Sequence, residues 1–192
     1  MKLFTFFTAA CVAVTAVFAI EESSTSPDSS PFTVQLQHSP EISRDYVHRL
    51  QLIRQDYKLP SFDANRLGWP RQIDSQTMQH NLISSRDHPR FVYLGQPEWN
   101  KPEMALATPV TLQAKPDGSH YWALMTVKPP PQGGVPDLAV HGFVKVPDGA
   151  GMFNEMNSHV LSREAVLDKG HTLTIDQVLS ELSLLKGPTF GV

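Results

Sequence analysis

The sequence has a single cysteine, Cys11, and it lies in an apolar stretch close to the N-terminus. Small exported proteins often rely on disulfides, because their compartment lets the bonds form and persist. If the N-terminal stretch is removed, no disulfide can form within the mature chain, so packing alone must hold the fold. Either the fold needs no covalent cross-link, or the mature protein ends in a reducing place such as the cytosol of another cell.

Several other features are missing, and each absence excludes a class of protein. Lys and Arg number 16 against 19 Asp and Glu, so the chain lacks the basic surface that nucleic acid or an anionic membrane would require. No Asn-x-Ser/Thr acceptor is present, since Asn157-Ser158 is followed by His159. No Gly-x-Ser-x-Gly elbow or phosphate-binding loop occurs. We therefore expect no nucleic acid, no cofactor and no bound metal.

The N-terminus has the layout of a secretory signal peptide. Lys2 is followed by an uncharged run from Leu3 to Ala19, and acidic and polar residues come directly after it. The alternative, a membrane anchor, is disfavoured because the run is at the lower limit for spanning a bilayer and ends in small residues. The sequence predicts a signal peptide over 1–19, cut between Ala19 and Ile20, and no membrane segment thereafter.

The rest of the chain reads as an arm followed by one domain. Residues 20–38 are rich in Ser and Pro and are predicted to be a disordered arm. Within this arm "FTVQLQ" alternates between apolar and polar residues, as an edge strand does. Residues 39–192 are long enough for a single hydrophobic core, and we expect a monomeric domain.

Three helices are predicted from start signals and apolar periodicity. The first begins at Ser39-Pro40, and its apolar positions recur at steps of three and four: Ile42, Tyr46, Leu50, Ile53 and Tyr57. The second begins at Asp74, which is predicted to cap it. The third begins after Thr174, which forms a capping-box pattern with Gln177 in the first turn.

The middle of the chain has β character. Strands are predicted over 90–95, 105–114, 119–128 and 138–146, and Pro109 suggests that the second of them is an edge strand or contains a bulge. The stretch "PDGAGMFNEMNS" (147–158) reads as a loop. The fold class is therefore predicted as α+β, an antiparallel β-meander of three to five strands with the N-terminal and C-terminal helices packed on one face.

Histidines are the strongest candidates for chemistry. His120 and His141 lie on neighbouring predicted strands; if the connecting loop is symmetric, His141 faces Met125 and His120 faces Val146. That register places the two histidines several residue pairs apart, too far to share a metal. If the protein is an enzyme, the acid and base groups to test are His120, His141, Glu155 and His159.

Loop aromatics and prolines are the candidates for interaction. Trp69 and Trp99 lie in predicted loops, where tryptophans serve either as binding anchors or as pegs into the core. Pro129, Pro130 and Pro131 either present a polyproline ligand or simply connect two strands.

The opening "MKLFTFFTAACVAVTAVFA", the short Ser/Pro-rich arm and the cysteine-free remainder resemble the small secreted effectors of plant-pathogenic fungi, the smut fungi in particular. The resemblance implies secretion, translocation into the cytosol of a host cell and action by binding a host protein. Two other classes stay open. One is a small secreted hydrolase, ribonuclease- or glycosidase-like, and the other is an extracellular carrier of a small apolar ligand held between sheet and helices.

Overall fold

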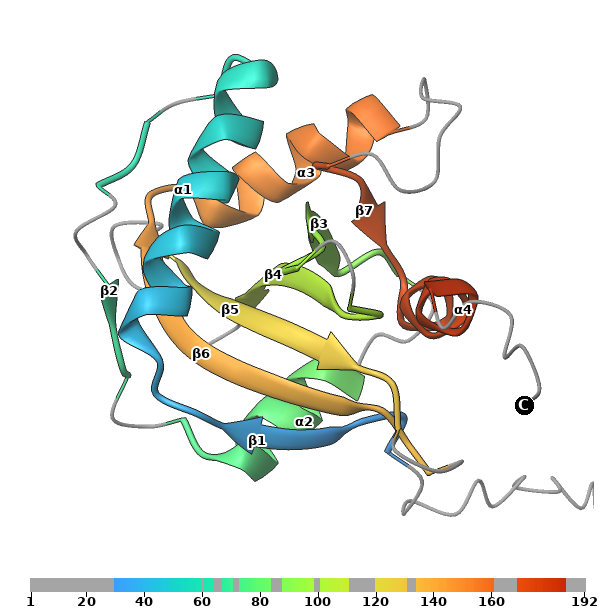
Figure 1. The fold of residues 1–192 in the computed structure, drawn as a ribbon. Helices are drawn as coiled ribbons and strands as arrows, with labels where there is room; N and C mark the ends of the chain where they lie inside the picture. Colours follow the sequence, from blue (N-terminus) through green and yellow to red (C-terminus); the bar gives the residue numbers. More distant parts are fainter. Residues whose placement is uncertain are drawn as a thin grey trace, which may run out of the picture.

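The computed structural model describes residues 30–59, 61–63, 67–70, 73–83, 88–98, 101–110, 120–130, 134–160 and 169–185. In these residues four consecutive strands form the middle of the chain, with helices and shorter strands before and after them (Figure 1). Their order is β1 (Thr33–Leu36), α1 (Pro40–Asp56), β2 (Leu67–Gly68), α2 (Ser75–Ile83), β3 (Phe91–Gly95), β4 (Met104–Val110), β5 (His120–Lys128), β6 (Asp137–Val146), α3 (Gly149–Val160), β7 (Thr172–Leu173) and α4 (Ile175–Leu185).

All the described strands belong to one sheet of seven, in the order β1-β6-β5-β4-β3-β7, with β2 also paired to β6. The α+β class is confirmed. The four strands β3 to β6 form an antiparallel meander, but the sheet is larger than predicted and mixed, because β1 runs parallel to β6. β1 is the edge strand that the alternation in "FTVQLQ" predicts. The folded domain therefore begins before residue 39, inside the range predicted as an arm.

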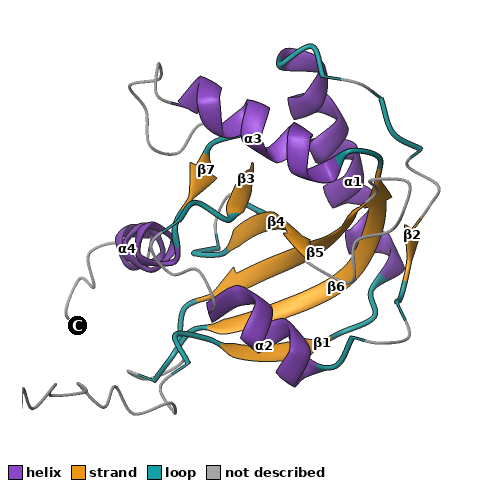
Figure 2. Cartoon of the chain, turned by 180° about the vertical axis from the view of Figure 1, so that it is seen from behind, coloured by secondary structure: helices purple, strands orange, loops and turns teal. Residues whose placement is uncertain are grey.

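The helices cover both faces of the sheet, so the prediction that they pack on one face was wrong. One buried cluster contains Tyr46 and Leu50 of α1 together with Met152 and Met156 of α3. The other cluster, on the opposite face, receives its helical side chains from α2 and α4. α1 crosses in front of the sheet in Figure 1, and α2 lies in front of it in the reverse view of Figure 2. The result is a three-layer arrangement of helices, sheet and helices.

The predicted helix starts are confirmed for α2 and α4. The Thr77 amide donates to Asp74 Oδ1 at 2.7 Å, and Thr174 and Gln177 exchange the two hydrogen bonds of a capping box. α1 starts at Pro40 as predicted, but the Ser39 side chain makes no capping hydrogen bond. Ile42, which periodicity assigned to the buried stripe, is 39% exposed.

Two local predictions were wrong. Residues 149–160 form helix α3 instead of a loop: Asp148 Oδ1 accepts a hydrogen bond from the Gly151 amide, and Met152 and Met156 enter the core one turn apart. β4 is an interior strand and has no bulge at Pro109, which pairs with Trp122. Proline is tolerated there because the pairing with β3 has already ended at Ala107.

Candidate functional site

A β-bulge in β6 sets the position of His141. Leu124 of β5 pairs with Gly142, and the next residue, Met125, pairs with Val140, so His141 is the extra residue of β6. The expectation that His141 faces Met125 was therefore wrong. A bulge turns the side chains of a strand relative to its partner. Regular alternation would place Val140 and Val144 on the same face of the sheet. Because of the extra residue, Val140 faces the α2/α4 cluster and Val144 faces the α1/α3 cluster.

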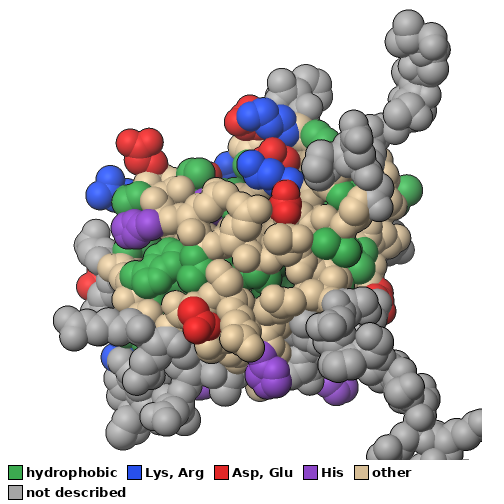
Figure 3. Space-filling model, turned by 90° about the horizontal axis from the view of Figure 1, so that it is seen from below, with side chains coloured by type: hydrophobic (Ala, Val, Ile, Leu, Met, Phe, Trp, Pro, Cys, Tyr) green, Lys and Arg blue, Asp and Glu red, His purple; other side chains and the backbone are tan. Residues whose placement is uncertain are grey.

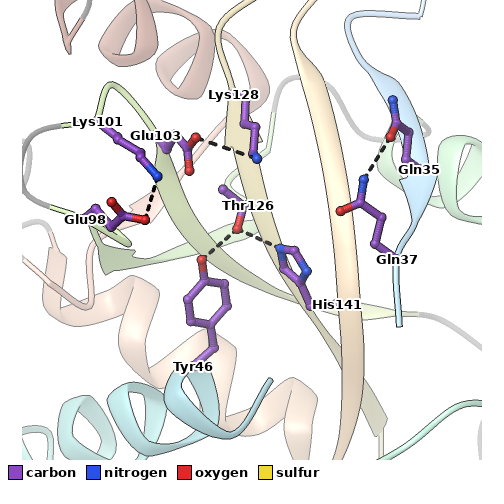
Figure 4. A network of polar contacts seen from close by, with 9 residues as sticks. All are labelled: Gln35, Gln37, Tyr46, Glu98, Lys101, Glu103, Thr126, Lys128 and His141. Carbon is purple, nitrogen blue, oxygen red and sulfur yellow. Dashed lines mark hydrogen bonds and ion pairs between the residues drawn. The ribbon is translucent and has the colours of Figure 1, made fainter. Parts of the chain in front are cut away.

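His141 is the end of a buried chain of three polar side chains (Figure 4). Its Nε2 lies 2.8 Å from the hydroxyl oxygen of Thr126, and that oxygen lies 2.6 Å from the hydroxyl oxygen of Tyr46. The three residues come from β6, β5 and α1, and each is at most 3% exposed. We call this group the Tyr46–Thr126–His141 triad. It joins α1 to β5 and β6 through polar contacts inside the core.

The triad is uncharged at neutral pH. Burial, and to a smaller extent the positive charge of Lys128, lowers the pKa of His141 to about 4. Burial raises the pKa of Tyr46 to about 12, against the opposing effect of its hydrogen bond to Thr126. The Nδ1 atom of His141 is buried and has no hydrogen-bond partner among the described residues. A buried polar atom of this kind is uncommon and calls for an explanation.

A pocket of about 190 Å³ lies beside the triad, at the edge of β6. On that edge β1 pairs with residues up to Val140 and β2 pairs from Phe143 onward, so the ladder is interrupted at His141 and Gly142. We call this hollow the β1–β2 pocket. The residues that line it are His38, Pro40, Ser43, Arg44, Leu67, Gly68, Trp69, His141, Gly142 and Phe143.

One wall of the β1–β2 pocket is aromatic. The Trp69 ring meets the Phe143 ring edge-on, with centroids 5.1 Å apart, and the His38 ring lies 5.5 Å from Trp69. Trp69 also packs against the α2/α4 cluster, so its ring is partly buried in the core and partly accessible from the pocket. In the view from below, hydrophobic side chains gather on the side of the molecule where β2 lies, next to a histidine (Figure 3).

The opposite wall is the first turn of α1. It lies so close to β6 that a Cβ on Gly142 would overlap the Ser43 hydroxyl oxygen and come within 3.2 Å of Ser43 Cβ. A larger residue at 142 would force the Ser43 side chain to move, so glycine allows the close approach of α1 to β6. The same turn carries Arg44, whose guanidinium is exposed and makes no hydrogen bond or ion pair in the described part of the chain. Among the described lining residues, Arg44 is the one with a permanent charge, and none is acidic.

The enzyme candidates do not meet at one place. His120 pairs with Val146, as predicted, and lines a separate hollow of about 210 Å³ with Arg90, Phe153 and neighbouring residues. Glu155 is exposed on α3, and the His159 side chain lies outside the described residues. His120 and His141 are thus several residue pairs apart, which confirms the expected separation.

The interaction candidates are only partly described. Trp69 lines the β1–β2 pocket. Pro129 and Pro130 are half-buried directly after β5, whereas Trp99, Pro131 and the predicted cut between Ala19 and Ile20 fall outside the described residues. Sequence reasoning missed Tyr46 and Thr126 as polar core residues, and it missed Arg44. The sequence His141-Gly142 inside an apolar strand was the available signal, because glycine in a strand often marks a bulge.

The described residues lack both a metal-ligand cluster and a membrane-spanning helix. They contain no group of three or more His, Cys, Asp or Glu side chains able to hold a metal ion. Within the same residues, no helix combines the length and the apolar character needed to cross a bilayer.

Comparison with known proteins gave no match, whether to protein-family models, to curated proteins or to solved structures.

Proposed function

We propose that the chain is an exported protein that acts by binding another protein, and that the partner adds an extended segment to the outer edge of β1. The observation that supports this proposal is an open sheet edge: among the described residues, no strand pairs with the side of β1 that faces away from β6. Strand addition to such an edge is a recurrent way of recognising a peptide segment.

The hydrogen-bonding pattern of β1 identifies the groups that a partner would meet. The Thr33 amide donates to Pro136 O at 2.9 Å and the Gln37 amide donates to Val140 O at 2.8 Å. In a parallel ladder alternate residues bond to the same neighbour, so Val34 and Leu36 direct their N–H and C=O groups outward. These groups are what an added strand uses.

Exposed apolar side chains flank this edge. Val135, 48% exposed, precedes the residue that accepts the Thr33 amide hydrogen bond, and Ile42, 39% exposed, lies in the first turn of α1 just beyond β1. β1 is the lower edge of the sheet in Figure 1, so Figure 3 looks onto it from below.

Substitution of Val34 by proline tests the proposal. Proline removes the outward N–H of β1 and leaves the hydrogen bonds to β6 in place, which is where edge strands tolerate it. Val34→Thr keeps the N–H and is the matched control. The C-terminally tagged full chain is recovered from the medium of a secreting host, and the proteins that bind each variant are quantified by mass spectrometry.

We expect at least one protein to bind the wild type and Val34→Thr but not Val34→Pro. The wild type and both variants should show the same cooperative melting. Equal binding by all three variants would contradict docking at β1. Failure of the tagged chain to reach the medium would contradict export.

A further inference from the structure

The β1–β2 pocket combines an apolar, aromatic wall with a cationic one. One wall is apolar and aromatic, formed by Trp69, Phe143 and Leu67. The other carries the Arg44 guanidinium, which no described residue pairs and which no acidic residue of the lining balances. A ligand that suits both walls has a flat apolar part and a negative charge, because guanidinium pairs best with planar anions such as carboxylates.

The size of the pocket limits the apolar part to one ring. Its volume is about 190 Å³, and an apolar cavity of about 150 Å³ accommodates a benzene molecule. Edge-to-face contact is a preferred arrangement of aromatic rings, and Trp69 and Phe143 already adopt it with each other. A ligand ring against these two side chains would extend this packing.

The backbone around the pocket is built to hold the two walls in place. The Ser39 amide donates to His141 O at 3.0 Å, which fixes the start of α1 against the bulge of β6. Gly142 allows the close approach of Ser43, and the triad ties the next turn of α1, at Tyr46, to β5. Arg44 therefore projects from a helix turn that is anchored on both sides, which is what a preorganised site requires.

We propose that the β1–β2 pocket binds a single-ring aromatic carboxylate, with the ring against Trp69 and Phe143 and the carboxylate on Arg44. This chemistry has two sources: a free aromatic acid, or the last residue of a peptide that ends in phenylalanine. The inference does not depend on strand addition at β1, because the two sites share no backbone group and are tested by different variants.

The test uses 3-phenylpropionate as the probe and the full mature chain as the receptor. Binding is followed by calorimetry and by the amide shifts of a ¹⁵N-labelled sample. We expect saturable binding, with the largest shifts at Trp69, Gly142 and the first turn of α1. Arg44→Gln should weaken binding about tenfold or more, since a charge-assisted hydrogen bond is lost. Lys101→Gln, which removes a charge in the loop before β4, should leave the affinity unchanged.

Two further ligands complete the test. One lacks the negative charge, and the other distinguishes a free aromatic acid from a peptide C-terminus. The amide 3-phenylpropanamide should bind at least tenfold more weakly than the acid. A short N-acetylated peptide ending in phenylalanine identifies a chain terminus as the ligand if it binds tighter than 3-phenylpropionate, and a free acid if it binds more weakly or not at all. Absence of saturable binding for both acids, or equal affinities for wild type and Arg44→Gln, would overturn the proposal.

Discussion

The two edges of the sheet are built differently. At one edge β7 is short, and His171, Thr172 and Leu173 are all buried. The Thr172 hydroxyl donates to Asn157 of α3, and α4 begins two residues after β7. At the other edge β1 and β2 leave a gap in front of His141, and β1 offers outward amides and exposed side chains.

This difference indicates where the molecule is available to a partner. Natural sheets protect their edges with short strands, covering helices or charges, because an open edge is a template for pairing with another chain. The β7 edge is protected by its length and by two helices. β1 is longer and carries no charged residue; α2 packs against one of its faces, but no described strand pairs with its outer backbone groups. The pocket lies at the β1–β2 edge, next to the bulge of β6 and the His141 end of the triad.

The largest expected effect is a dependence on pH that originates at the open edge. In the unfolded chain His141 takes up a proton near its ordinary pKa of 6.5, while in the folded protein its pKa is about 4. The unfolded state therefore binds more protons between these values, and the free energy of unfolding falls as the pH drops from about 6.5 to about 4. The contribution of His141 to this fall amounts to about 3 kcal/mol.

Urea unfolding of the wild type and of His141→Gln, at several pH values, measures this contribution. Glutamine is neutral throughout the range and can still reach the Thr126 hydroxyl. The difference in unfolding free energy between the two proteins should shrink or reverse as the pH falls from 7 to 4. A difference that stays constant over this range would show that His141 does not set the acid sensitivity.

A smaller effect is expected for the loss of stability when one glycine at each edge is replaced by alanine. At the protected edge Gly170 has φ +91°, and a Cβ there would come within 2.8 Å of Ile53 Cγ2 and Tyr57 Cε2. Gly170→Ala should destabilise the protein by about 2 kcal/mol or more, because both backbone strain and overpacking oppose it. At the open edge, a Cβ added to Gly68 would have no atom within 4 Å. Gly68→Ala should therefore change stability by less than about 0.5 kcal/mol.

Thermal or urea unfolding of both variants gives the comparison directly. Equal losses at the two glycines would mean that the edges do not differ in packing. A loss at Gly68 alone would contradict the assignment of β1 and β2 to the open edge.

Elements with strong local signals could be predicted from the sequence. The apolar spacing of Tyr46, Leu50 and Ile53 identified α1, and the pair Thr174 and Gln177 identified the start of α4, because caps and amphipathic faces are encoded within a few residues. Such a stripe shows that a helix has a buried side but not which face of the sheet it covers. The prediction of one covered face failed for this reason.

The missed features depend on contacts between distant residues. Gly149 and Gly151 lower the helix propensity of residues 149–160, yet Gly149 is what allows the start of α3 to reach Trp122, whose Nε1 would lie 2.6 Å from an added Cβ. The bulge at His141 and the parallel pairing of β1 with β6 likewise involve segments far apart in the chain. The candidate site depends on all of these, so only its individual residues, His141 and Trp69, could be named in advance.

Residue-resolved amide exchange of the free protein tests the open edge most directly. If the outer side of β1 is free, the amides of Val34 and Leu36 should exchange rapidly, whereas those of Thr33, Gln35 and Gln37 should be protected by their bonds to β6. That alternation is the result that the proposed docking at β1 predicts. Equal protection of Val34 and Gln35 would mean that another segment or a second chain already covers this edge, and would contradict the proposal.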